Sequence, residues 1–349
     1  MQHLILPDYL EDYIRRSLAR LNVSVMDASY LAPMIQALSD YYTGADRRRT
    51  PWDRRETLVA YFAYFLPLHF CRNLQAIQRG QSLGFFKGVD TIVDVGAGLG
   101  TSRLAFHRLL PELGADYLAY DPYVESEWRW HQEAWSPRTR WADTAAALRN
   151  VRGPVLGVFS YSLNEFLSDF STMQAGDYLR WDQLMFVEPA LMKDARRLMA
   201  LREPLLRAGY SIWAPCTHTD RVLWQLPDWL RALHAKLPMH NESLSFSYLL
   251  VSRRPPEQIV ATPTLLADSP ARTGPAAWRV VGDPLREKGK TRQMVCRSET
   301  REFLSWLDRD GPRDVAYARG DLLPALAETD FVRRGGGELR VLRRKQRGD

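Results

Sequence analysis

Residues 91–106 read TIVDVGAGLGTSRLAF, an apolar run followed by three closely spaced glycines and a stretch with helical character. A strand that ends in such a turn and opens a helix presents backbone N–H groups to a ligand, and glycine permits close backbone approach. From residue 89 to about 254 the chain continues to alternate short β-rich runs with helical stretches. This alternation predicts an α/β fold in which helices cover both faces of a parallel sheet.

Seven β-rich runs are expected to form this sheet: TIVDVG, DYLAYD, TRWAD, PVLGVFSYS, QLMFVEP, YSIWAP and SFSYLLVSR. Between two of them, ARRLMALREPLLRAG is expected to be a helix that stops at Gly209. We expect three parts: a helical N-terminal region (1–88), the α/β domain (89–254) and a small β-rich C-terminal domain with a basic tail (255–349). The last part begins with a Pro-rich stretch and contains an expected hairpin, WRVVGDPLREKGKTRQMVCRS.

Composition narrows the class of protein. The chain has 349 residues, 46% of them hydrophobic, so it can bury a large core. Its apolar runs are shorter than a membrane span, and its first residues lack the basic start of a secretory signal. The three cysteines, Cys71, Cys216 and Cys296, are far apart, which fits a reducing compartment better than a disulfide framework. We therefore expect a cytoplasmic protein without membrane contact.

The basic residues are unevenly distributed, although the net charge is only +6. One cluster is Arg47, Arg48 and Arg49, and a second occupies the segment 333–347, where Glu338 is the only acidic residue. Such clusters can contact phosphates, but a solvated surface is the commoner use of a charge run.

The spacing of the glycines distinguishes between cofactors. A dinucleotide-binding turn has glycines at its first, third and sixth positions. Counted from Gly96, the sixth position is Thr101, and the glycines present follow the spacing G-x-G-x-G. Asp94 precedes them by two residues, and Asp121 closes the next expected strand, where an acidic residue can accept hydrogen bonds from ribose hydroxyls.

These residues, with Asp143 after the third strand, resemble the class I S-adenosylmethionine (SAM) dependent methyltransferase fold, a Rossmann-like seven-stranded sheet whose last strand is antiparallel. The resemblance implies that SAM is the cofactor, that Asp121 holds its ribose and that Asp143 lies near its adenine. The glycines would line its amino-acid end. The full set of expected cofactor-binding residues is Asp94, Gly96, Ala97, Gly98, Gly100, Asp121, Pro122, Asp143 and Ser160.

A second resemblance covers about residues 57–300. The segments ETLVAYFAYFLPLHFCRNLQAI, FSYSLNEF, MFVEP, YSIWAPCTH and LSFSYLLVSRR are similar to the mitochondrial small-ribosomal-subunit assembly methyltransferase-like family and its bacterial relatives. Members of that family carry a cysteine-ligated iron–sulfur cluster. Here Cys216 and Cys296 match two of the four ligands, whereas Val222 and Leu230 occupy the other two positions. A four-iron cluster needs four ligands, so we expect none. The family's turn after its Val-Glu-Pro strand is also replaced, which favours a different substrate.

Candidate substrate-side residues follow the fourth and fifth strands, since ligands bind at the carboxyl ends of strands in open α/β sheets. They are Tyr161, Asn164 and Glu188. Each also has a structural interpretation: Tyr161 as a packing residue, Asn164 as a helix cap and Glu188 as the partner of an arginine. A general base is needed only if the nucleophile starts protonated.

Three functions remain open from the sequence. The first is SAM-dependent methylation of small-subunit ribosomal RNA, or a role in assembly of that subunit. The second is methylation of a small molecule on the same scaffold, and the third is a non-catalytic assembly factor. Four tryptophans after Asp121 offer stacking surfaces for bases, although a core role is commoner: Trp128, Trp130, Trp135 and Trp141. His218, beside Cys216, is interpreted as a structural histidine.

Overall fold

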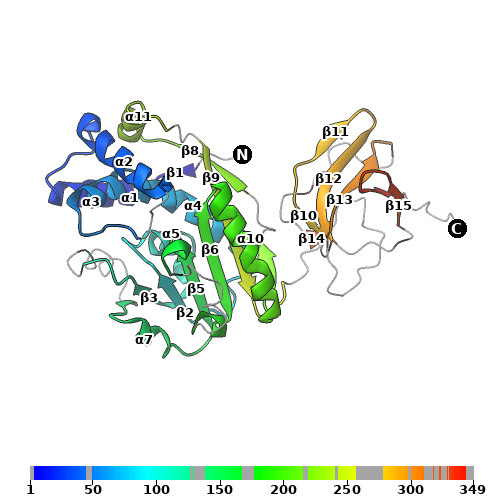
Figure 1. Ribbon diagram of the computed structural model, residues 1–349, viewed down its shortest axis with the longest axis horizontal. Coiled ribbons are helices and arrows are strands. Elements are labelled where there is room, and N and C mark those ends of the chain that lie inside the picture. Colours follow the sequence, from blue (N-terminus) through cyan, green and yellow to red (C-terminus); the bar gives the residue numbers. More distant parts are fainter. Residues whose placement is uncertain are drawn as a thin grey trace. The chain divides into compact units, whose positions relative to one another are not determined.

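The protein is described by a computed structural model in residues 4–44, 49–125, 128, 138–166, 177–214, 219–239, 243–256, 278–297, 300–309, 317, 322–323, 328 and 330–342. The chain forms two compact units. One consists of residues 1–213 and 219–255, and the other of residues 214–218 and 256–349 (Figure 1).

A nine-stranded sheet forms the centre of the larger unit. All seven expected strands are present: β2 (Thr91–Val95), β3 (Asp116–Tyr120), β4 (Thr139–Trp141), β5 (Val155–Ser160), β6 (Gln183–Pro189), β7 (Ser211–Ala214) and β9 (Ser243–Ser252). Two strands that the sequence did not predict join them, β1 (Leu4–Ile5) and β8 (Thr219–Gln225). The sheet is therefore two strands wider than expected.

The order of the strands places a ligand crevice at a defined point. It is β4-β3-β2-β5-β6-β9-β8-β1, with β7 paired to β9. Strands β2 to β6 pair in parallel, whereas β9 runs antiparallel to β6, as expected for SFSYLLVSR. The chain moves outward from β2 to β4 and then returns to place β5 on the other side of β2. Loops leaving the carboxyl ends of β2 and β5 diverge at such a switch point, which leaves a crevice between them.

Helices dominate the first 88 residues, as predicted. They are α1 (Asp8–Arg20), α2 (Ala28–Thr43), α3 (Arg55–Ala60), the π-helical turn η1 (Tyr61–Phe65) and α4 (Leu66–Ser82). The last three form one continuous rod, ETLVAYFAYFLPLHFCRNLQA, in which residues 57–71 are all buried. These helices belong to the same compact unit as the sheet, and α4 packs on both α5 and β9.

Alternation along β9 shows which helix covers which face. Gly80 of α4 packs against Leu250, whereas Leu249 and Val251 share a buried cluster with Leu201 of α10. Successive side chains of a strand point to opposite faces, so α4 and α10 cover opposite sides of the sheet. The predicted helix before Gly209 is α10 (Met192–Arg207), and Gly209 has the positive φ of 86° typical of a helix stop.

The remaining helices of the larger unit are short. They are α5 (Thr101–Leu109), η2 (Pro111–Leu113), α7 (Ala145–Leu148), α8 (Leu163–Phe166), η3 (Asp177–Arg180) and α11 (Asp228–His234).

The smaller unit contains a seven-stranded sheet in the order β14-β10-β12-β13-β16-β15, with β11 paired to β12. Its strands are β10 (Trp278–Val280), β11 (Leu285–Glu287), β12 (Lys290–Arg297), β13 (Thr300–Leu307), β14 (Leu322–Leu323), β15 (Phe331–Arg334) and β16 (Glu338–Val341). The predicted hairpin is formed by β11 and β12. Its core includes Trp278, Val295 and Trp306.

Candidate functional site

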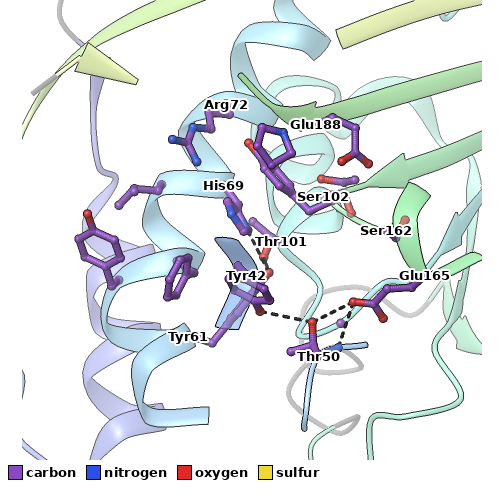
Figure 2. Close-up of a pocket in the computed structure, with 18 of the residues that line it drawn as sticks. Tyr42, Thr50, Tyr61, His69, Arg72, Thr101, Ser102, Ser162, Glu165 and Glu188 are labelled. Atoms are coloured by element: carbon purple, nitrogen blue, oxygen red, sulfur yellow. Dashed lines mark hydrogen bonds between the residues drawn. The ribbon is translucent and has the colours of Figure 1, made fainter. Parts of the chain in front are cut away.

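A cavity of about 230 Å³ lies at the carboxyl ends of β2, β3, β5 and β6, against the helical rod (Figure 2). Most of its described lining residues come from two sources. The sheet edge contributes the glycine turn, Asp121, residues 160–162, Glu165, Glu188 and Pro189. The N-terminal helices and the segment between α2 and α3 contribute aromatic and polar side chains. The latter include Tyr42, Thr50, Trp52, Tyr61, Tyr64, Phe65, His69 and Arg72. The N-terminal helices therefore cover the crevice at the switch point of the sheet.

The glycine turn is fixed by hydrogen bonds to the neighbouring strand. Gly96 and Ala97 donate their N–H groups to the Tyr120 carbonyl at 2.8 and 3.1 Å. The Gly98 N–H donates to Asp121 Oδ2 at 3.0 Å. Gly96 and Gly98 have φ values of 72° and 52°, which favour glycine, so the backbone lies against β3 in a form that other residues rarely adopt.

Asp121 connects this turn to the loop that follows β3. Its carboxylate is only 2% exposed and accepts a second N–H, from Tyr123 to Oδ1, at 3.0 Å. Asp121 therefore orders the turn, and it also lines the cavity.

Asp94 lies behind the turn and does not line the cavity. Its Oδ2 accepts hydrogen bonds from Ser102 at 2.5 Å and from Tyr117 at 2.7 Å. Oδ1 is buried and has no hydrogen-bond partner among the described residues. Burial raises the pKa of this carboxyl to about 6, although the two hydroxyl donors oppose the shift.

The helical wall of the cavity is linked to the glycine turn through a chain of polar contacts. The Tyr61 hydroxyl lies 3.2 Å from Thr101 Oγ1, at the start of α5, and 3.3 Å from His69 Nδ1. The His69 ring stacks on Tyr161 at a centroid distance of 3.7 Å and an interplanar angle of 10°. Burial lowers the pKa of His69 well below its ordinary value, with Arg72 adding to the effect, so the imidazole is neutral at pH 7.

Tyr161 follows β5 and has an unusual backbone. Its φ is 61°, in the left-handed region, and its N–H donates to the Val187 carbonyl at 2.8 Å. A bulky residue held in this conformation is strained, and such residues cluster at functional sites. Burial raises the pKa of its hydroxyl to about 12, while Arg72 opposes the shift. The phenol is therefore protonated at neutral pH.

Polar side chains fix the remaining positions at this edge. Asn73 of α4 donates to Ser160 Oγ at 2.9 Å, and Glu188, 1% exposed, accepts the Leu163 N–H at 3.1 Å. Glu165 Oε1 accepts both the N–H and the hydroxyl of Thr50, at 3.1 and 3.0 Å (Figure 2). The segment that begins at residue 49 is thereby attached to the helix after β5.

Most of the residues predicted for the site lie in one place. Gly96, Ala97, Gly98, Asp121, Ser160, Tyr161 and Glu188 all line the cavity. Gly100, with φ of 80°, precedes the first residue of α5, and Asp94 lies behind the turn. Pro122 and Asp143 are exposed and are not among the described lining residues, and the side chain of Asn164 lies outside the described residues. The roles assigned to these residues remain predictions.

Sequence reasoning did not identify the helical half of the lining. Tyr61, Phe65, His69 and Arg72 recur at spacings of four, four and three residues, so they share one face of the rod. Polar residues on that face, within an otherwise apolar helix, are a usable signal. The sequence around Trp52 gives no such signal, yet the Trp52 ring is 3.1 Å from the position that a Cβ on Gly98 would take.

Other sequence features can be placed in part. Arg49 lies over the Tyr123 ring at 4.7 Å, and Arg47 and Arg48 lie outside the described residues. In the basic C-terminal segment, Arg333 pairs with Glu302 and Glu328, and Arg340 pairs with Glu338. The segment from residue 343 onward is outside the described part.

The cysteine positions can be followed only in part. Cys216, His218 and the side chain of Val222 lie outside the described residues, Leu230 is buried in α11, and Cys296 is on β12. Within the described residues, no group of three or more His, Cys, Asp or Glu side chains is arranged to hold a metal ion. The absence of a cluster stays a prediction.

The tryptophans that follow Asp121 are likewise only partly described. The Trp128 ring is 6.1 Å from Phe62, and Trp141 ends β4. Trp130 and Trp135 lie outside the described residues. Phe62 is a buried residue of η1, so Trp128 packs against the helical rod.

The strand order, the antiparallel β9, the glycine turn after β2 and the acidic residue after β3 define the class I methyltransferase fold. No protein-family model and no curated protein matches the chain. Among solved structures, it is similar to the 16S rRNA methylase ArmA, with 13% identity, 63% of this chain and 97% of that chain covered, and a TM-score of 0.35.

Two further similar structures have the names of methyltransferases that act on small molecules. One is the 1,6-didemethyltoxoflavin-N1-methyltransferase of Burkholderia thailandensis, with 14% identity, coverage of 66% of this chain and 90% of that chain, and a TM-score of 0.33. The other is the precorrin-6y C5,15-methyltransferase of Geobacter metallireducens, with 14% identity, coverage of 50% and 85%, and a TM-score of 0.33. Because these scores are low, the fold assignment rests on the strand order and the glycine turn.

The described helices include none with the length and apolar character needed to cross a membrane.

Proposed function

We propose that the protein is a SAM-dependent methyltransferase. The observation that carries the proposal is the hydrogen bond between Asp121 and the Gly98 N–H, which joins the glycine turn to the end of β3 beside a cavity. The residues present fit the cofactor: the backbone of Gly96 to Gly98 lines the cavity without side chains larger than a methyl, and Asp121 lines it at the strand end where an acidic residue can accept hydrogen bonds from ribose hydroxyls.

In methyl transfer, the main task of this chain is to position the acceptor against the methyl group. SAM supplies a methyl group on a sulfonium, and transfer to an acceptor is an in-line displacement that depends on near-attack geometry. Tyr161 and Glu188 lie at the ends of β5 and β6, on the side of the cavity away from Asp121, and we assign them to the acceptor. The hydrogen-bonded backbone of Tyr161 and the buried carboxylate of Glu188, which accepts the Leu163 N–H, suit orientation of a substrate.

For the acceptor, we propose RNA of the small ribosomal subunit, or a role in assembly of that subunit. The support is the similarity of about residues 57–300 to the ribosomal assembly family. The basic segment from residue 333 onward adds positive charge, but its described arginines Arg333 and Arg340 are already paired with glutamates.

A small-molecule acceptor is the second candidate, and the cavity itself favours it. Aromatic side chains of the helical rod and of the segments beside it line this cavity, and pockets with apolar walls and a few fixed polar groups are typical of small ligands. The third candidate is a scaffold that binds the cofactor without catalysis and serves only in assembly of the subunit.

Calorimetric titration with SAM and with S-adenosylhomocysteine (SAH) tests the proposal, with and without small-subunit RNA. Micromolar binding of both is the expected result. Transfer of labelled methyl to RNA, or to an extract of small molecules, then identifies the acceptor class. Salt-dependent RNA binding supports the first candidate, and its absence the second. No binding of either cofactor under any condition would reject the enzyme and leave the scaffold role.

A further inference from the structure

The N–H groups of the glycine turn are already used within the protein. Those of Gly96 and Ala97 bind the Tyr120 carbonyl, and that of Gly98 binds Asp121. In many nucleotide sites, the N–H groups of such a turn bind an anionic group of the ligand. Here these three are not available for that purpose, so an anionic group in the cavity needs another donor.

Arg72 is the only arginine or lysine among the described residues that line the cavity. No ion pair involves it within the described part of the chain, and its buried Nε has no hydrogen-bond partner there. The other charged lining residues are the carboxylates of Asp121, Glu165 and Glu188, and His69 is neutral. A carboxylate ligand therefore has one cationic partner in this cavity, whereas an ammonium group has several anionic ones.

The position of Arg72 is fixed by its neighbours. It follows His69 by one helical turn, and its guanidinium carbon lies 5.9 Å from the centre of the Tyr161 ring. The adjacent Asn73 donates a hydrogen bond to Ser160 Oγ at 2.9 Å, which attaches this turn of α4 to the end of β5. The backbone from which Arg72 reaches the cavity is therefore anchored to the sheet edge.

The sheet order places Arg72 opposite the proposed ribose site. Strands β3, β2 and β5 are consecutive neighbours, so Asp121, the glycine turn and Ser160 follow one another along the edge. Asp121 lies at one end of this row, and Arg72 of α4 lies near its other end, beside Tyr161. SAM carries its ribose and its α-carboxylate at separate positions, with the sulfonium between them.

We propose that Arg72 binds the α-carboxylate of the cofactor and thereby positions its amino-acid end. This inference rests on the proposed function, and it assigns to the helical rod a part of the cofactor site that the glycine turn does not supply. The planar guanidinium suits a carboxylate because it donates two parallel hydrogen bonds.

The test compares two ligands that differ in the carboxylate alone, SAH and its decarboxylated analogue S-adenosyl-3-thiopropylamine. Each is titrated by calorimetry into the wild-type protein, Arg72→Gln and the control Arg79→Gln. Arg79 lies on the same helix and does not line the cavity. We expect wild type and Arg79→Gln to bind SAH about 10- to 100-fold more tightly than the analogue. In Arg72→Gln the two ligands should bind equally.

Three results would overturn the inference. Equal loss of affinity for both ligands in Arg72→Gln means that Arg72 supports the fold of the site only. Full retention of the preference for SAH means that the carboxylate lies elsewhere, for example at the first turn of α5. If the wild type binds neither ligand, the proposed function itself fails.

A second variant covers a folding defect. Should Arg72→Gln show an altered circular-dichroism spectrum, Arg72→Lys replaces it, since lysine keeps the charge but not the paired donors. The preference for SAH should then fall about 3- to 10-fold rather than vanish. An unchanged preference in Arg72→Lys would contradict the paired hydrogen bonds that the inference assigns to the guanidinium.

Discussion

Replacement of Asp121 by alanine tests the cofactor site most directly. The carboxylate is buried at 2% exposure, and its two bonds to the N–H groups of Gly98 and Tyr123 are both 3.0 Å long. The carboxylate also lines the cavity, at a strand end where an acidic residue can accept hydrogen bonds from ribose hydroxyls. Asp121→Ala removes the interactions with the ribose and one support of the turn.

The expected loss of SAH affinity follows from the hydrogen bonds to Asp121 that are replaced by hydrogen bonds to water. A bond to a charged group contributes about 1.5 to 3 kcal/mol net, and ribose hydroxyls that lose their acceptor regain water where the cavity is open. We therefore expect SAH to bind Asp121→Ala more weakly by about 1 to 3 kcal/mol, roughly 5- to 150-fold in Kd. Part of this loss reflects the Gly98 N–H, which loses its carboxylate partner.

A matched control and a truncated ligand separate these contributions. Asp116 starts the same strand, is half exposed, and makes an ion pair with Arg140 at 3.5 Å, so Asp116→Ala should leave affinity unchanged and stability within about 1 kcal/mol. A 2′,3′-dideoxy analogue of SAH should bind wild type more weakly than SAH, but bind Asp121→Ala as well as SAH does. Wild-type affinity for SAH in a folded Asp121→Ala protein would refute the reasoning.

The other predictions concern stability. Because burial raises the pKa of Asp94 from 3.8 to about 6, the folded state binds a proton between these values, and the stability contributed by this carboxyl falls as pH rises from 4 to 6 and stays lost above. Asp94→Asn should therefore gain about 2 to 3 kcal/mol relative to wild type between pH 4 and pH 7 in urea unfolding, and a constant difference would contradict the shift. Gly157→Ala should destabilise the sheet by about 1 to 3 kcal/mol, since its Cβ would lie 2.3 Å from Trp181 Cε3, and an unchanged denaturation midpoint would show that Trp181 moves aside. Glu338→Ala removes acceptors for Lys290 and Ser305 at 2.9 and 2.7 Å, which should cost about 1 to 3 kcal/mol in the smaller unit and leave SAH affinity intact; lost affinity would contradict this.

The strands of the larger unit were predictable because their signal is local. Each of the seven expected runs is β-rich and bounded by turn residues, and the glycines after β2 require a turn whatever surrounds them. Strand β1 has only two residues and pairs with β8, more than 200 positions away, so no local pattern announces it. Strand β1 thus depends on pairing rather than on its own composition.

The site likewise has features that the local sequence indicates and features that depend on distant contacts. Asp121 and Tyr161 were identifiable because they end strands, and the edge of a parallel sheet collects strand ends in one place. The positive φ of Tyr161, in contrast, accompanies a bond between its N–H and Val187 on the neighbouring strand, and no local pattern indicates it. The contact of Thr50 with Glu165 joins residues 115 positions apart, and neither sequence segment carries a sign of the other.

The two halves of the cavity have different consequences for function. The half formed by β2 and β3 is built from backbone geometry and Asp121, and it can change little without loss of the turn. The helical half is built from side chains of the rod, such as Tyr61 and His69, which project from a continuous helix and can be exchanged without altering its backbone. We therefore expect the helical half, together with Tyr161 and Glu188 at the ends of β5 and β6, to determine acceptor specificity, and the strand order that identifies the fold carries no information about it. Arg72 connects the two halves, because it projects from the helical half and yet, in our proposal, binds the cofactor beside the glycine turn.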